Sequence, residues 1–284
     1  MTRVLSALVL LPVVIGTIWF LPPSGTLALA VIAGVLALIE FSAMAKALGV
    51  AVPRVVAGTA MVLVIVAMGS GDVVAHDRAM AGSYYLFPNF VPVVLLAMLI
   101  VGGAIAVGRG SPSPGVLADV AATAFAPLYL GLPLGALVWV RANWWFASGR
   151  ADGRAAVLLL LGVIVVSDSA QYYCGRAFGR RPLAPAISPK KTVEGAIGGV
   201  VFGTAATMLG GYYIFNTPLW IVGLLGAAIA FLGIVGDLFE SLLKRSAGVK
   251  DSSNLIPGHG GVLDRIDSWL FAAPVYYMFV RFVA

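Results

Sequence analysis

The sequence predicts an all-α, polytopic integral membrane protein with about nine transmembrane helices. Hydrophobic residues make up 61% of the 284-residue chain and charged residues only 11%, whereas a soluble domain carries roughly 25% charged residues. The mean hydropathy is +1.01. Apolar stretches of about 20 residues, the length that crosses a bilayer as a helix, occupy most of the chain. Little sequence is left for a separate water-soluble domain.

Nine apolar segments stand between turn-forming residues, and each is interpreted as one helix. They are 4–21, 25–46, 53–70, 86–107, 117–140, 155–174, 193–215, 218–240 and 266–283. Gaps such as Pro22-Pro23, Gly71-Asp72 and Asn216-Thr217-Pro218 contain residues that favour turns. The first segment follows Met1-Thr2-Arg3 as a signal peptide would, but no small-residue cleavage site follows it. A first transmembrane helix is therefore expected.

The distribution of basic residues predicts that the N-terminus is cytoplasmic. With that orientation, 13 of the 18 Lys and Arg residues fall on the cytoplasmic side and 5 on the other, as the positive-inside rule requires. Loop charge of this kind explains the net charge of +6, so no nucleic-acid partner is expected. The single cysteine, Cys174, excludes a disulfide within the chain.

Six acidic residues lie within the predicted helices or at their ends, all toward the predicted cytoplasmic side. They are Glu40, Asp119, Asp168, Glu194, Asp237 and Glu240. Ionisable groups inside a membrane helix are costly unless they are paired, hydrated or bound to a cation. For Glu40 or Asp119 alone, a helix-end side chain that reaches for water is an equal alternative. The convergence of all six predicts a polar cavity that opens to the cytoplasm.

The segment 241–267 is the densest block of charge and is interpreted as an active site. It holds 7 of the chain's 30 charged residues in 27 positions, which an ordinary cytoplasmic loop could also do. Its arrangement is more specific, because Asp237, Glu240, Ser241 and Lys244 have the i, i+3, i+4, i+7 spacing of one helix face. Glycines around His259 allow close approach of a ligand to the backbone.

Carboxylates and cations in this pattern predict a site for a metal ion and phosphate. Carboxylate oxygens hold hard cations such as Mg²⁺, and lysine or arginine neutralises the charge on a transferring phosphoryl or nucleotidyl group. Asp264 and Asp267 share a helix face if the last helix has begun there. Zinc is not expected, because the chain has two histidines and one cysteine.

A second polar run, Ser188-Pro189-Lys190-Lys191-Thr192-Val193-Glu194-Gly195, is expected to open the seventh helix. A capping-type residue, a proline suited to a first helical turn and two lysines suggest a phosphate site at a helix N-terminus. A basic cap at a membrane boundary is the alternative. In the preceding helix, Asp168 has Gln171 and Tyr172 at i+3 and i+4 on the same side.

The segment from Ser241 to Asp267 resembles the signature of the phosphatidate cytidylyltransferases (CDP-diacylglycerol synthases). The matching run is SLLKRSAGVKDSSNLIPGHGGVLDRID, and the Ser188–Gly195 run and Asp168 also resemble family features. The clear likeness covers about residues 160–284. Residues 1–150 are therefore expected to be variable transmembrane helices and residues 151–284 the catalytic membrane region.

The resemblance implies transfer of CMP from CTP to phosphatidic acid, which gives CDP-diacylglycerol and pyrophosphate and requires Mg²⁺. Asp237 and Asp264 would bind the metal, with one cation or a pair, and Lys244, Arg245, Asp264 and Asp267 would be catalytic. Ser188, Lys190, Lys191, Thr192, Lys250, His259 and Arg265 would bind substrate or phosphate. Asp168, Glu194, Glu240 and Asp251 would line the cavity.

The resemblance also implies a cell-membrane enzyme whose site faces the cytoplasm, where CTP meets a lipid of the bilayer. It further implies a homodimer, which no feature of the sequence itself tests. Another CTP-dependent lipid enzyme, such as a polyprenol kinase-like protein, is the nearest alternative, and the intact signature argues against it. A secondary transporter would place acids near the bilayer midplane in duplicated halves, and no duplication is visible.

Overall fold

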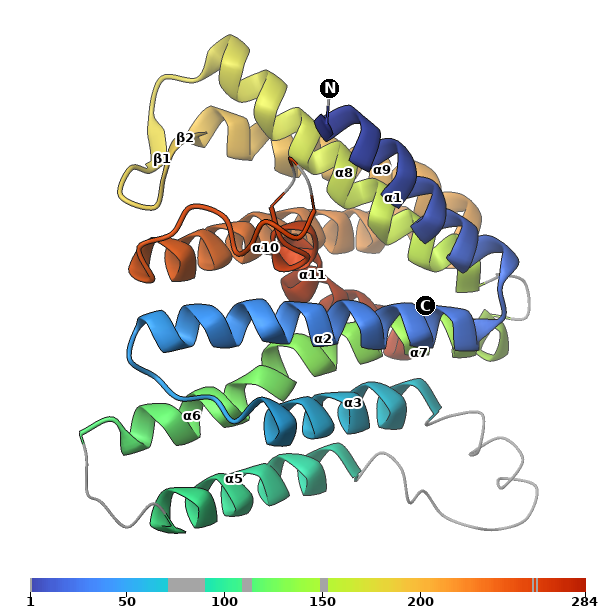
Figure 1. Cartoon of the computed structure of the whole chain (residues 1–284). Coiled ribbons are helices and arrows are strands. Elements are labelled where there is room, and N and C mark those ends of the chain that lie inside the picture. Colours follow the sequence, from blue (N-terminus) through green and yellow to red (C-terminus); the bar gives the residue numbers. More distant parts are fainter. Residues whose placement is uncertain (1, 71–89, 109–113, 149–152, 257, 259) are drawn as a thin grey trace, which may run out of the picture.

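The computed structural model describes residues 2–70, 90–108, 114–148, 153–256, 258 and 260–284 and is almost entirely helical (Figure 1). The first half contains α1 (Thr2–Phe20), α2 (Pro23–Ala47), α3 (Arg54–Ser70), α5 (Phe90–Gly108), α6 (Val116–Ala126), the π-helix η1 (Pro127–Gly131) and α7 (Leu132–Ser148). The second half contains α8 (Gly153–Phe178), β1 (Pro182–Ala184), β2 (Ser188–Thr192), α9 (Val193–Ile214), α10 (Leu219–Ser246) and α11 (Leu263–Phe282).

Each of the nine predicted segments coincides with helix in this structure, although residues 86–89 lie outside the described part. Within the described residues, six helical stretches are long and apolar enough to cross a membrane. They are Pro23–Ala47, Val91–Gly108, Val116–Asn143, Gly153–Phe178, Val193–Ile214 and Leu219–Ser246. The chain is thus a multi-pass membrane protein, while the number of nine crossings stays a prediction.

The π-helix η1 explains how α6, η1 and α7 form one continuous span. Pro127 has no backbone N–H and so cannot donate to the carbonyl oxygen four residues earlier. The turn that follows it is wide, because the N–H of Leu132 donates to the carbonyl oxygen of Pro127, five residues earlier. A π-turn of this kind interrupts a helix without ending it.

Helices α8, α9, α10 and α11 form the part of the bundle that carries the charged segments. Helix α9 packs on both α8 and α10, and α11 packs between α10 and α7. The Tyr276 hydroxyl on α11 donates to the carbonyl oxygen of Ala156 on α8 at 2.7 Å. The interface of α8 and α9 is close because small residues of α9 face α8, and a Cβ on Gly199 would lie 2.5 Å from Gln171 Cγ.

The run from Ser188 to Gly195 differs from its expected form as a helix start. Ser188–Thr192 is the strand β2, which pairs antiparallel with β1, and α9 begins only at Val193. Thr192 is the N-cap, since its hydroxyl accepts from the N–H of Gly195 at 3.1 Å. The prediction that Ser188 and Pro189 form the cap and first turn was therefore wrong, because these residues pair with β1 in a short hairpin, although the helix begins at the predicted residue, Val193.

We predict opposite effects for two glycine-to-alanine changes in this helix pair. Gly199→Ala should lower the melting temperature of the detergent-solubilised protein, because overpacking of this kind costs about 1–3 kcal/mol. Gly162→Ala on α8 is the matched control, since a Cβ there has nothing within 4 Å and alanine favours helix. Equal shifts in the two variants would show that the α8–α9 contact is looser than described.

Candidate active site

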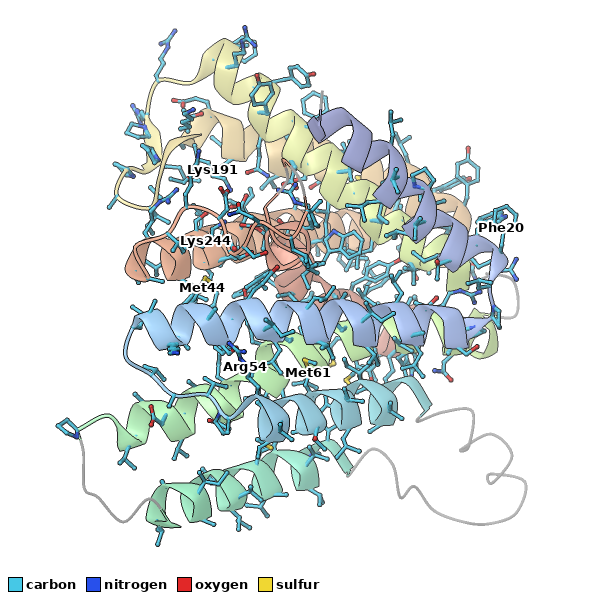
Figure 2. The ribbon with its side chains drawn as sticks, viewed as in Figure 1. Phe20, Met44, Arg54, Met61, Lys191 and Lys244 are labelled. Atoms are coloured by element: carbon cyan, nitrogen blue, oxygen red, sulfur yellow. The ribbon has the colours of Figure 1, made fainter. Side chains whose placement is uncertain are left out.

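Charged side chains from α8, β2, α10 and α11 come together where α10 leaves the bundle. Figure 2 shows Lys191 and Lys244 at the same end of the molecule, near the hairpin of β1 and β2 and the last turns of α10. Helix α10 supplies Asp237, Glu240, Ser241 and Lys244 from one stripe, as their spacing predicts. The side chains of the site therefore come from between residues 168 and 267, and helix packing brings them together.

Lys191 and Asp237 form an ion pair between β2 and α10. The Lys191 ammonium lies 2.6 Å from Asp237 Oδ2, and both side chains are partly exposed. The other oxygen, Oδ1, lies 3.4 Å from the Ser241 hydroxyl, one helical turn later. Because β1 holds β2 in an antiparallel pair, the hairpin fixes the position from which Lys191 reaches α10.

Lys244 stands between two carboxylates. Its ammonium forms ion pairs with Glu240 on the preceding turn of α10 and with Asp264 on α11. The side chain of Glu240 is fully buried, and those of Lys244 and Asp264 are only 11% and 5% exposed. A carboxylate buried to this degree needs a cation or several donors. Lys244 therefore joins α10 to the start of α11.

Asp264 also holds the loop that precedes α11. Its Oδ2 accepts from the backbone N–H and hydroxyl of Ser252, at 3.0 and 2.7 Å, and from the N–H of Gly261 at 2.7 Å. Burial alone would raise the pKa of Asp264, but the hydrogen bonds from Lys244, Gly261 and Ser252 outweigh it and lower the pKa to about 2. The carboxylate is therefore charged at any physiological pH.

Asp168, Asp237 and Asp267, which come from α8, α10 and α11, lie within electrostatic reach of one another. Each raises the energy of a negative charge on its neighbours, while Lys191 and Arg265 offset part of it at Asp168. Among the residues that the structure describes, no group of three acidic, histidine or cysteine side chains is arranged to hold a metal ion as it stands. Carboxylate oxygens are the donors that a hard cation prefers.

An aromatic cluster from α2, α6, η1, α10 and α11 lies beneath these charges. It consists of Phe41, Phe125, Tyr129, Phe239 and Phe271, with ring centroids 5.2 to 6.3 Å apart. The ring of Tyr129 is only 5% exposed, and the charges of Glu240 and Asp267 act on its hydroxyl. The cluster gives the site an apolar floor.

Several predicted site residues have other positions. Glu194 accepts from the backbone N–H groups of Arg180 and Arg181 at 3.0 and 3.2 Å, so it fixes the loop after α8. Arg245 donates to the carbonyl oxygen of Val249 at 3.0 Å within the loop after α10. Lys190, Lys250, Asp251 and Arg265 are exposed, and His259 lies outside the described residues.

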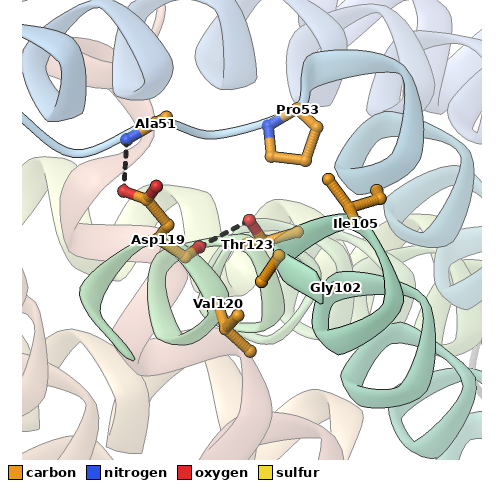
Figure 3. Close-up of a pocket in the computed structure, with 8 residues that line it drawn as sticks. Ala51, Pro53, Gly102, Ile105, Asp119, Val120 and Thr123 are labelled. Carbon is orange, nitrogen blue, oxygen red and sulfur yellow. Dashed lines mark hydrogen bonds between the residues drawn. The ribbon is translucent and has the colours of Figure 1, made fainter. Parts of the chain in front are cut away.

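Asp119 lies apart from the site, beside a small recess lined by α5, α6 and the α2–α3 loop (Figure 3). Its carboxylate accepts from the backbone N–H of Ala51 at 2.7 Å. The recess has room for about 10 Å³, enough for no more than one water molecule. Asp119 therefore holds a loop of the first half and does not line a substrate cavity there.

Glu40, which the sequence places at a cytoplasmic helix end, contacts the loop before α11. Its carboxylate accepts hydrogen bonds from Ser252, Ser253, Val262 and Leu263. No role was predicted for Ser252 or Ser253 from the sequence. The only signal for Glu40 was a single acid in an apolar run, and its partners are more than 200 residues away in the chain.

Comparison with known proteins shows similarity along the whole chain. A family described as the cytidylyltransferase family matches residues 1–283. A protein of Synechocystis sp. named phosphatidate cytidylyltransferase is 37% identical over 256 residues, which cover 86% of this chain and 84% of that protein. The similarity thus extends beyond residues 160–284, the range in which the sequence alone resembles a family.

Two further relatives match over less of their length. A phosphatidate cytidylyltransferase of Haemophilus influenzae is 46% identical over 140 residues, which is 46% of this chain and 49% of that protein. The uncharacterized protein YnbB of Escherichia coli is 37% identical over 204 residues, 70% of this chain and 65% of that protein.

We predict that the two lysines of the site differ in their contribution to stability. Lys244→Met should destabilise the protein by about 3 kcal/mol or more, because it leaves the buried Glu240 without its cation. Lys191→Met should change stability by less than about 1 kcal/mol, since that pair is partly exposed. Thermal unfolding of both variants in the same detergent measures the difference. A larger loss in Lys191→Met would contradict the assigned burial.

Proposed function

Because this chain belongs to the cytidylyltransferase family, we propose that it transfers a cytidylyl group from CTP to phosphatidic acid. The products are CDP-diacylglycerol and pyrophosphate, so the chain is a nucleotidyltransferase of phospholipid biosynthesis. The name of the Synechocystis relative, which aligns over 84% of its own length, supports this choice of substrates.

The gathering of Lys191, Asp237, Lys244 and Asp264 is the observation that carries the proposal. Lysines and carboxylates alternate there within one site, at the end of a bundle with an apolar floor. A nucleoside triphosphate and a lipid phosphate are both anionic, and their reaction concentrates negative charge on the transferring phosphorus. Preorganised cations stabilise that charge where water is excluded. A site of this composition suits phosphate chemistry at a membrane boundary.

The reaction needs positioning and charge neutralisation more than it needs a base. A phosphatidate oxygen, already ionised, attacks the α-phosphorus of CTP, and the bond to the pyrophosphate oxygen breaks as the new P–O bond forms. Lys191 and Lys244 are placed to neutralise phosphate oxygens, and Asp264 orients Lys244. Lys190, Lys250 and Arg265 are exposed cations that we assign to attraction and binding of the anionic substrates.

We propose that Mg²⁺ binds at Asp237 and Asp264, and that Asp267 and Asp168, whose charges influence each other, serve a second cation. In this structure the ammonium of Lys191 pairs with Asp237 and that of Lys244 pairs with Asp264. Both carboxylates therefore already have a positive charge beside them. When bound, the cation would supply Lewis-acid stabilisation of the phosphate oxygens and of the leaving pyrophosphate. Lys244 pairs with Asp264 Oδ1 here and is the lysine of this pair that would face phosphate.

The proposed substrates define where the site must lie. Phosphatidic acid lies in a leaflet and CTP dissolves in the cytosol, so we propose that this end of α10 faces the cytoplasm at the cell membrane. The excess of basic residues on that side agrees with the positive-inside rule. The homodimer implied by the family resemblance stays a prediction.

A labelling experiment tests the function directly. Purified protein in detergent is incubated with phosphatidic acid, Mg²⁺ and CTP that carries ³²P at either the α or the γ position, and the lipid is then chromatographed. We expect label in the lipid only from the α position, because CMP is transferred. Label from the γ position would indicate a lipid kinase instead. No labelled lipid from either form would contradict the proposal.

The same assay tests the site through one variant and its control. Asp237→Asn should lower kcat by about a hundredfold or more, because the amide cannot replace a charged metal ligand. Asp119→Asn, which changes an acid of the first half outside the site, should retain at least about half of the activity. Full activity in Asp237→Asn would remove that residue from the cation site.

A further inference from the structure

Glu40 is a buried carboxylate in a helix that is otherwise apolar. It lies in the third turn from the end of α2 and is 4% exposed. Burial of a charged carboxylate is strongly unfavourable unless donors surround it. The function proposed above does not use Glu40, and its position 200 residues before the signature segment gives no reason to expect a role there.

The two oxygens of Glu40 face four hydrogen-bond donors, which come from the loop before α11 and from the start of that helix. Oε1 accepts from the Ser253 hydroxyl at 2.7 Å and the N–H of Val262 at 3.0 Å. Oε2 accepts from the Ser252 hydroxyl at 3.0 Å and the N–H of Leu263 at 2.8 Å. A side chain of the first half of the molecule thus fixes both ends of residues 252–263.

Two of these donors belong to the first residues of α11. Val262 is the N-cap of that helix, and no side-chain hydrogen bond of its own caps the helix. The first N–H groups of a helix have no partner inside it, and its positive dipole end favours a carboxylate. Glu40 supplies from α2 the cap that the local sequence of α11 does not, and thereby fixes where α11 begins.

The hydroxyl of Ser252 connects Glu40 to the active site. Its single proton is shared between Glu40 Oε2 at 3.0 Å and Asp264 Oδ2 at 2.7 Å, so the loop is held between the two carboxylates. Asp264 in turn pairs with Lys244. A displacement of the loop at Glu40 would therefore move the partner that orients the phosphate-facing lysine.

Gly261 shows how closely the segment encloses this carboxylate. A Cβ at that position would collide with the Ser252 hydroxyl and the carboxylate of Glu40. At the next residue back, Gly260 has φ +78° and a Cβ there would approach Asp264 Oδ2 to 2.5 Å. The backbone can reach Glu40 and Asp264 at once only because neither residue has a side chain.

We propose that Glu40 is a positioning residue of the active site, which sets Asp264 and Lys244 by clamping residues 252–263 and the start of α11. It touches no substrate. The proposal rests on the function inferred above and makes α2 part of the catalytic machinery. Loss of the clamp should impair the stabilisation of charge that develops in the transition state, so it should affect kcat more than substrate binding.

The test compares Glu40→Gln with the unmodified protein in the α-labelled CTP assay. The amide offers one acceptor oxygen where the carboxylate has two, and its NH₂ faces donors. We expect kcat to fall at least about tenfold while the KM for CTP changes less than about threefold. Hydrogen–deuterium exchange should become faster at Val262 and Leu263 and stay unchanged in α9 and α10, since only the local clamp is lost.

Two controls accompany this variant. Asp119→Asn removes a carboxylate of the first half that accepts a backbone N–H elsewhere, and both kcat and exchange at Val262 should stay within about twofold of the unmodified protein. Ser253→Ala removes one hydrogen-bond donor to Glu40 and keeps the Glu40 carboxylate. This variant therefore tests the clamp even if Glu40→Gln does not fold. We expect its kcat to fall about threefold or more.

Three results would overturn the clamp. The first is an unchanged kcat in both Glu40→Gln and Ser253→Ala. The second is a fall in the kcat of Glu40→Gln with equally faster exchange throughout α9 and α10, and the third is unchanged exchange at Val262 and Leu263 in that variant. If the unmodified protein forms no labelled lipid, the proposed function fails instead. The exchange measurement needs no substrate and still tests the clamp in that case.

Discussion

Burial of carboxylates in an apolar helical bundle is the constraint on which this structure depends. Glu40, Glu240 and Asp264 are almost completely shielded from solvent, where an ionised carboxylate is tolerated only with matched donors or cations. Lys244 supplies the cation for two of them, and serines and backbone N–H groups supply the rest. Because these partners come from α2, α10, α11 and the segment between, satisfying the buried charge also assembles the site.

The same constraint separates the acids into two kinds. Glu40 accepts from neutral donors, the hydroxyls of Ser252 and Ser253 and the N–H groups of Val262 and Leu263, so its role is to fix the backbone at the start of α11. Asp237, in contrast, is partly exposed and pairs with Lys191, and we propose that it binds the cation together with Asp264. In this account Glu40 positions the backbone, and Asp237 and Asp264 bind the cation at the end of α10.

Much of the fold could be predicted from the sequence, because hydropathy and turn residues act over a few positions. The helix face shared by Asp237 and Lys244 follows from spacing alone, and α10 contains it. The strand at Ser188–Thr192 was mistaken for a helix start because its capping-type serine, proline and lysines also suit a helix N-terminus, whereas the short hairpin with β1 determines its conformation. The role of Glu40 could not be foreseen, since its partners are joined to it only by the packing of α2 on α11.

The position of a bound cation tests this division of the acids most directly. A crystal structure of the protein with CTP and Mn²⁺, which replaces Mg²⁺ and scatters anomalously, locates the ion without reference to activity. The account predicts an anomalous peak at the carboxylates of Asp237 and Asp264, with Glu40 still bonded to Val262 and Leu263. A peak at Glu40, or one remote from the end of α10, would contradict it.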